Sequence, residues 1–318
     1  MSKKLIIGLL LYVGTLVSSF SQSLQLDFLF SSGLTYSSEF HGAAQVNDSI
    51  DFNFNKHQLQ FIFPLKTKIN LDLKNLDFKK MNLSSSQLFL TSKIGLNQSS
   101  FSGKSTNNIY KASIGITGLN AGIRQGIWVY SANLYVDESD KSYKENLVPN
   151  FRGYGARVKV KSFDFIYFYG AGLVVNQGKF YPVPILGLQK RILRNWIPYK
   201  TKLKIVFPLE LKVNIEPLKF LNIDFGANFD GINTLYRQDS YFSNNNKSVN
   251  YRQIKYFSSI NFKIKSTFKL RIEIGSSESQ SFKFYDGKTQ EIESVHYVAF
   301  TLNCQFGKSL FGQFVNPQ

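Results

Sequence analysis

The stretch that decides the fold is 202–213, which reads KLKIVFPLELKV. Every odd-numbered position in it is apolar, whereas four of the six even-numbered positions carry lysine or glutamate. A repeat of two residues is typical of a β-strand whose two faces meet different surroundings. The same alternation recurs in 221–230 and in 254–264.

The length of these runs favours strands that cross a membrane. A strand of a soluble protein averages about 5 to 6 residues, whereas one that crosses a bilayer needs about 9 to 11. The mean hydropathy of −0.15 is too low for a helical membrane protein, but a barrel needs apolar residues only at alternate positions. The 30 phenylalanines and 17 tyrosines, with only 8 prolines, also favour strands. We therefore predict an all-β fold, a closed antiparallel transmembrane β-barrel of about 12–14 strands.

The first residues have the pattern of an export signal. Lys3 and Lys4 precede an apolar stretch at 5–17, and small residues precede an expected cleavage between Ser21 and Gln22. The apolar stretch is shorter than the ~20 residues of a spanning helix. We predict a signal peptide at 1–21, one barrel domain at 22–318, and a location in the outer membrane of a Gram-negative bacterium. Cys304 is the only cysteine, so no intramolecular disulfide forms.

The charge of the chain is strongly positive. The formal net charge is +17, and loss of Lys3 and Lys4 with the signal leaves +15. The lysines are spread singly along strands without a nucleic-acid recognition motif, so we expect no nucleic-acid partner. We predict that basic residues on the polar parity face the lumen and favour small anionic solutes; they are Lys159, Lys161, Lys202, Lys204, Lys255, Lys263, Lys269 and Arg271.

The expected strands are separated by connections of unequal length. The strands are predicted at 24–35, 50–63, 65–73, 87–96, 109–117, 127–136, 152–161, 165–174, 182–190, 202–215, 220–229, 251–264, 268–275 and 295–306. Long polar connections at 137–150, 230–250 and 276–294 alternate with tight ones at 161–164 and 265–267, as in outer-membrane barrels. Pro208 and the similarly placed Pro64 should lie at a turn or a bulge, because proline cannot donate a ladder hydrogen bond.

Candidate groups for chemistry are few. The histidines are His41, His57 and His296; Ser49 and Ser294 lie near the last two, without a Gly-x-Ser-x-Gly motif. Asp137, Glu138 and Asp140 form an acidic group in an expected loop, which could bind calcium but lacks the glycine of an EF-type loop. Solvated loop charge is the simpler interpretation. We predict no enzymatic activity, no catalytic residues, no cofactor and no metal.

Three segments resemble a known family. They are YPVPILGL at 181–188, FPL at 207–209 and ANFDG at 227–231. They are similar to an uncharacterised family, a domain of unknown function, of outer-membrane β-barrel proteins from Bacteroidota-type bacteria. The resemblance implies an outer-membrane barrel without a known activity, and no catalytic residues to transfer. Its partners would be outer-membrane lipids and the barrel assembly machinery. One departure is that the last alternating strand ends at Phe306 and a tail follows to Gln318.

The functional prediction is a structural barrel or a narrow pore that favours anions. Two alternatives remain open at the level of sequence. One is a secreted, soluble β-sandwich that binds glycans through its aromatic residues. The other is an outer-membrane lipid or peptide hydrolase, which would need serine, histidine and an orienting group to meet on one surface.

Overall fold

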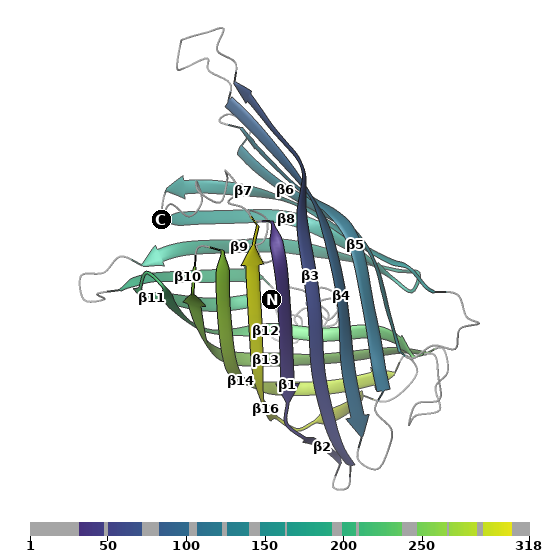
Figure 1. Ribbon diagram of the computed structural model, residues 1–318. Coiled ribbons are helices and arrows are strands. Elements are labelled where there is room, and N and C mark those ends of the chain that lie inside the picture. Colours follow the sequence, from purple (N-terminus) through teal and green to yellow (C-terminus); the bar gives the residue numbers. More distant parts are fainter. Residues whose placement is uncertain are drawn as a thin grey trace, which may run out of the picture.

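The computed structural model describes residues 32–47, 50–71, 83–101, 107–122, 126–139, 147–162, 164–192, 199–207, 210–236, 247–265, 267–284 and 289–306. These residues form strands joined by turns and short irregular segments (Figure 1). The strands are β1 (Gly33–His41), β2 (Ala44–Asn47), β3 (Ile50–Leu71), β4 (Leu83–Phe101), β5 (Asn107–Gly122), β6 (Gly126–Ser139), β7 (Asn150–Ser162), β8 (Phe165–Asn176), β9 (Lys179–Ile192), β10 (Lys200–Phe207), β11 (Glu210–Leu218), β12 (Leu221–Tyr236), β13 (Lys247–Lys263), β14 (Phe268–Phe284), β15 (Thr289–Ile292) and β16 (Val295–Gln305).

The sheet closes on itself. Each main strand pairs antiparallel with its neighbour along the chain from β3 to β14, β14 pairs with β16, and β1 pairs with both β16 and β3. The short strands β2 and β15 add to β3 and β14 at one end and are not part of the ring. The ring therefore has 14 strands, which confirms the predicted closed antiparallel barrel at the upper end of the expected count. The alternative of two packed sheets in a soluble sandwich is wrong.

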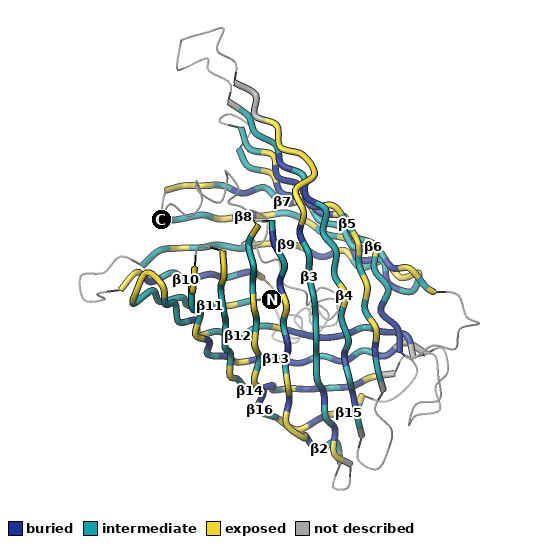
Figure 2. Tube along the Cα trace, in the orientation of Figure 1, coloured by how far each residue is buried: buried dark blue, intermediate teal, exposed yellow. Residues whose placement is uncertain are grey.

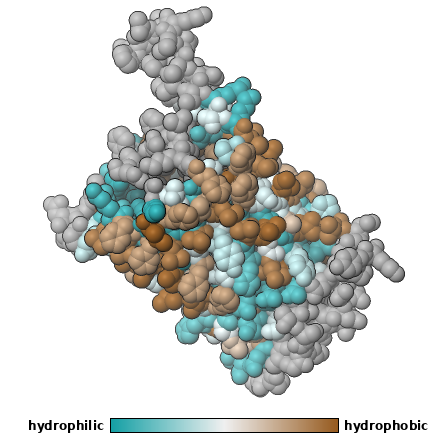
Figure 3. Space-filling view, viewed as in Figure 1, coloured by the Kyte–Doolittle hydropathy of each residue, from teal (hydrophilic) through white to brown (hydrophobic). Residues whose placement is uncertain are grey.

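The two parities of each strand face opposite sides of the wall. On β12 and β13 the outward positions are apolar and exposed, as for Phe225 and Tyr256, whereas Asp224 and Lys255 on the other parity are buried inside. Figure 2 shows the resulting alternation of burial along the strands. Figure 3 shows a broad apolar band across the viewed face, with hydrophilic side chains gathered below it. The outer surface thus has the character of a membrane-crossing barrel.

The chain divides near one of the two prolines and continues past the other. β10 ends at Phe207 and pairs with β11, which begins at Glu210, so 202–215 is two strands, as a turn at Pro208 requires; Pro208 itself lies outside the described residues. Pro64 lies inside the continuous strand β3, where the register with β4 shifts between Pro64 and Lys66. The expected break between 63 and 65 is therefore a bulge, which tolerates a residue without an N–H donor. The division at 208–209 adds one strand to the fourteen expected segments and the continuity of β3 removes one, so the count stays at 14. The part of the expected first strand before residue 32 lies outside the described residues.

The barrel has a terminal end, where β1 begins and β16 ends, and an opposite loop end. The strand ends on either side of 140–149, 237–246 and 285–294 lie at the loop end, and those joined by the tight connections 163–164 and 264–267 lie at the terminal end. The sorting by length is incomplete, because the strand ends on either side of 72–82 lie at the terminal end and 177–178 is tight at the loop end. In Figure 1, β3 to β6 also extend beyond the rest of the wall at the terminal end.

A bulge in β14 changes which residues face inward. Ser277 is buried inside, and Ser279 then adopts a φ of 48°, in the left-handed region that few residues other than glycine occupy. The register with β13 shifts at this point, between Arg252 and Ile254. As a result Gln280 and Phe282, although even-numbered, continue the inner face that odd-numbered residues form earlier in the strand.

The loop end of the interior is filled by apolar side chains. We call them the loop-end cluster, and they are Ala44, Phe52, Phe54, Ile109, Ile232, Val249, Tyr251, Phe282 and Ile292. Here β12 also meets β6, since the Thr234 hydroxyl donates to the Asp137 carbonyl at 2.8 Å, although five strands separate β6 from β12 around the wall. The barrel is therefore narrowed at this end. A second apolar cluster lines the inner face of β5 to β10.

Glycines allow inward aromatic rings to lie against the wall. A methyl group on Gly226 would lie 2.4 Å from the Leu211 carbonyl oxygen and 2.8 Å from the Phe257 ring. We expect Gly226→Ala to lower the unfolding free energy by about 1 to 3 kcal/mol, because the backbone oxygen cannot move aside without distorting the ladder. Denaturant titration of the barrel in detergent micelles measures this loss. Gly155→Ala is the matched control, since nothing lies within 4 Å of its added methyl group. Equal stability of the two variants would contradict the close packing.

Candidate functional site in the barrel interior

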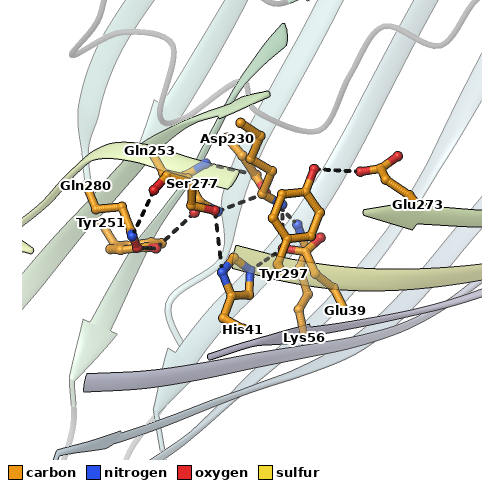
Figure 4. A network of polar contacts seen from close by, with 12 residues as sticks. Glu39, His41, Lys56, Asp230, Tyr251, Gln253, Glu273, Ser277, Gln280 and Tyr297 are labelled. Atoms are coloured by element: carbon orange, nitrogen blue, oxygen red, sulfur yellow. Dashed lines mark hydrogen bonds and ion pairs between the residues drawn. The ribbon is translucent and has the colours of Figure 1, made fainter. Parts of the chain in front are cut away.

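A buried ion network crosses the lumen just below the loop-end cluster (Figure 4). Its centre is Lys255 on β13, whose Nζ lies 2.7 Å from Oδ2 of Asp230 on β12 and also contacts Glu39 on β1. Lys56 on β3 reaches the same Asp230 oxygen at 3.1 Å. Four strands lie between β3 and β12 in the ring. The network therefore holds separate parts of the wall together through the interior.

His41 connects this network to β14 and β16. Its Nε2 lies 2.5 Å from Glu39 Oε1, and because a carboxylate only accepts, this nitrogen carries the proton. Its Nδ1 lies 3.4 Å from the Ser277 hydroxyl, and its ring stacks on Tyr297 at 5.3 Å. The Tyr297 hydroxyl in turn donates to Glu273 at 2.8 Å.

The side of the network nearest the loop end is closed by neutral groups. The Tyr251 hydroxyl lies 2.7 Å from Gln280 Oε1 and 3.0 Å from Gln253 Oε1. The Tyr251 ring also contacts Phe54 and Phe282 of the loop-end cluster. The ions are thus separated from the loop end by packed aromatic rings.

A second set of ion pairs follows β10 to β14 toward the terminal end. Its contacts are Lys204 to Glu210 at 2.8 Å, Lys212 to Glu210 at 3.5 Å, Lys212 to Asp224 at 3.9 Å, Lys263 to Glu216 at 3.7 Å, and a contact of Arg271 with Glu273. Alternating charges of this kind neutralise one another along the inner wall.

The basic residues expected in the lumen are placed differently from one another. Lys202, Lys204, Lys255, Lys263, Lys269 and Arg271 lie on the inward parity of their strands. Lys204, Lys255, Lys263 and Arg271 contact carboxylates, so they supply less unbalanced positive charge than expected. Lys159 instead lies opposite Tyr167, an exposed ring of the outer face, and Lys161 is exposed at the end of β7. Neither of these two faces the lumen as predicted.

Four inward cations on β3 to β7 were not singled out from the sequence: Lys56, Lys93, Lys111 and Arg152. Lys111 pairs with Asp137 at 3.0 Å, and Arg152 lies 5.4 Å from the centre of the Tyr135 ring. The sequence around Lys56 is NKHQLQ at 55–60, with polar residues on both parities, so it did not reveal which face points inward. Only the register with neighbouring strands shows this.

The other candidate groups are engaged in local contacts. His57 lies on the outer face beside Phe40. Its Nδ1 is hydrogen-bonded to the Ser38 hydroxyl at 2.7 Å. Among the described contacts, nothing orients the other ring nitrogen, so the pair lacks the third group of a hydrolytic triad. His296 lies on the outer face and Ser294 contacts Glu278, whereas Ser49 lies outside the described residues.

The acidic group expected in a loop lies partly in a strand. Asp137 and Glu138 are buried near the end of β6, where Asp137 pairs with Lys111 and Glu138 accepts from the Val148 N–H at 2.7 Å. Their expected place in a solvated loop is therefore wrong, and Asp140 lies outside the described residues. The described part of the chain contains no group of three or more histidine, cysteine, aspartate or glutamate side chains placed to hold a metal ion. Nor does that part of the chain contain a helix that is long and apolar enough to span a membrane.

Comparison with solved structures returns β-barrels at very low identity. The chain is similar to the beta domain of the Bordetella autotransporter Brka, at 8% identity and a TM-score of 0.37 over 86% of this chain and 100% of that one. It is similar to the KdgM porin at 8% identity and 0.35, over 86% and 99% of the two chains. An outer membrane channel from Pseudomonas putida F1 gives 9% identity and 0.34, over 87% and 96%. Each TM-score is below 0.5, so the barrel assignment rests on the strand pairing of this chain.

No family model matches the chain, and no curated protein matches it. Membership of the Bacteroidota-type family suggested by 181–188, 207–209 and 227–231 therefore stays a prediction.

The central role of Lys255 is testable by substitution. We expect Lys255→Gln to lower the unfolding free energy by about 3 to 5 kcal/mol, because Glu39 and Asp230 lose the cation that they share. Denaturant titration in detergent checks this. Lys255→Gln with Glu39→Gln should recover much of the loss, since Asp230 keeps Lys56. Lys263→Gln is the control, because that side chain is 37% exposed and its pair with Glu216 is worth at most about 1 kcal/mol. Similar losses in the two single variants would contradict the special role of Lys255.

Proposed function

We propose that the protein is an integral outer-membrane barrel with a narrow lumen that favours anions. The observation that carries the proposal is a closed ring of 14 strands that is apolar outside and charged inside. A soluble protein gains nothing from exposing so many large apolar side chains, whereas the acyl chains of a bilayer would cover them.

The outer belt supports the membrane location. Ile260 lies opposite Ile223 on one side and Ile272 on the other, and Ile272 lies opposite Phe300. These side chains form a continuous apolar row near the middle of the belt. In this proposal the signal peptide at 1–21 directs export, the barrel assembly machinery inserts the strands, and outer-membrane lipids surround them. The outer membrane is the location that strand-based spanning favours in a Gram-negative bacterium.

The interior supports a narrow passage. A barrel of this size has room for water inside, but inward side chains can plug it. Here the loop-end cluster and the contact between β6 and β12 narrow one end. A purely structural barrel is the second version of the proposal, favoured by the same packing.

The charges near the ion network support a preference for anions. The cations Lys56, Lys93, Lys111, Arg152 and Lys255 outnumber the carboxylates Glu39, Asp137 and Asp230 by two. A low-dielectric wall strengthens the resulting positive potential within the lumen. The predicted lysines on β10 to β14 contribute less, because carboxylates pair with them.

Membrane insertion is tested at the middle of the outer belt. We expect Ile260→Lys to lower the unfolding free energy in lipid vesicles by about 2 to 4 kcal/mol, because it places a charge among acyl chains. His296→Lys, on the outer face nearer the loop end, should cost no more than about 1 kcal/mol. Unfolding followed by heat-modifiable gel migration gives both values. The membrane location would be refuted if both variants were as stable as the parent and the parent were extracted by carbonate.

The pore is tested in planar bilayers. With a tenfold KCl gradient, the reversal potential should have the sign expected when chloride permeates faster than potassium, because the lumen carries excess positive charge. Raising the salt concentration should weaken the preference through screening. Absence of conductance would favour the structural version. A preference for potassium would contradict an anion-favouring lumen.

A further inference from the structure

The inner wall of β3 to β7 has a section that water reaches. On β4 the inward residues Asn97 and Phe89 are buried, but the inward residues between them are partly exposed. On β5, Ile109 and Thr117 enclose a partly exposed stretch in the same way, and β3, β6 and β7 repeat the pattern. We call these inward positions the inner middle section. It lies between packed layers on either side, so solvent or a solute can occupy it.

Two cations in the inner middle section have no counterion. Lys93 projects from β4 and Arg152 from β7, and neither has a carboxylate within ion-pair distance among the residues described here. Their neighbours differ, since Lys56 pairs with Asp230 at 3.1 Å and Lys111 pairs with Asp137 at 3.0 Å. The excess positive charge of this region is therefore carried by Lys93 and Arg152.

The strand register places Arg152 on the same side of the wall as Lys93. Lys93 lies opposite Ser113, Ser113 lies opposite Tyr135, and the Arg152 guanidinium lies 5.4 Å from the centre of the Tyr135 ring. Two cations without carboxylate partners that face one lumen between low-dielectric walls repel each other, and an anion between them would relieve that repulsion. The other ionised inward groups of the network show the usual outcome, in which each cation meets a carboxylate of the chain.

The inward residue of β5 between Lys93 and Tyr135 is small. It is Ser113, whereas the Asn133 side chain lies over the neighbouring Gly115. Arg152 lies against the Tyr135 ring, which fixes the direction of its planar group. A guanidinium presents paired N–H donors that match the two oxygens of a carboxylate or phosphate, whereas the lysine ammonium supplies a point charge beside it.

We propose that Lys93 and Arg152 bind an oxyanion, a carboxylate or a phosphate group of a small solute, in the inner middle section. This deepens the proposed anion-favouring lumen and rests on it for its biological meaning, but the binding itself does not require conduction. The Arg152 guanidinium donates hydrogen bonds to two oxygens of the group, and the Lys93 ammonium neutralises its charge. Lys111, already paired with Asp137, adds a weaker positive field.

The test is calorimetric titration of the detergent-folded barrel with inorganic phosphate and, separately, with acetate and citrate at constant ionic strength. We expect saturable binding to the parent, and a loss of at least tenfold in affinity in both Lys93→Gln and Arg152→Gln. Lys93→Arg should retain binding, because the positive charge remains. Lys263→Gln, which removes a paired inward cation elsewhere, is the matched control and should bind as the parent does. Heat-modifiable migration confirms that each variant is folded.

The outcomes separate the site from the pore. Tighter binding of phosphate than of citrate or acetate would identify a phosphorylated solute, and the reverse order a carboxylate. Binding of phosphate or citrate by a barrel that conducts no current would refute the pore and support the site. No saturable binding by the folded parent, or equal binding by the parent, Lys93→Gln and Arg152→Gln, would overturn the proposal.

Discussion

Closure of the sheet is the constraint on which the rest of the structure depends. In hydrocarbon each unpaired backbone N–H or C=O group costs several kcal/mol, so a spanning sheet cannot have a free edge. The pairing of β1 with both β16 and β3 removes that edge. Closure also creates an inside, so the strand parity that faces away from lipid must meet other side chains or water. The ion network and the loop-end cluster are two ways of satisfying that inner face.

The interior is organised by charge pairing rather than by an open polar surface. Lys255 satisfies carboxylates from β1 and β12, and Lys56 approaches one of them from β3. Removing one member of such a group leaves a buried charge alone, which is why its members depend on one another. Lys93 and Arg152 depart from this pattern inside the same wall, and that contrast is what assigns them to an external anion.

The fold could be predicted from the sequence where the two strand faces differ chemically. The alternation in 221–230 and 254–264 defines β12 and β13, because apolar residues face outward and charged ones inward. The prediction fails where the direction of a side chain, or the end of a strand, depends on the partner strand. Lys159 follows an alternating pattern but faces outward, and Pro64 lies at a bulge of a strand that continues. The contact of Lys56 with Asp230 joins residues 174 positions apart, so no local pattern could indicate it.

The left-handed Ser279 shows how such a wall can absorb a change in chain length. A strand has a period of two, so one added or lost residue exchanges its inward and outward faces from that point onward. At Ser279 the extra residue stays outside the ladder, and Gln280 and Phe282 reach the interior, where they meet Tyr251. Deletion of Ser279 would therefore leave Gln280 and Phe282 facing inward, whereas deletion of a residue within the ladder would turn them toward lipid. A bulge is thus a position at which a barrel can gain or lose one residue in evolution without exchanging the inward and outward faces of the strand.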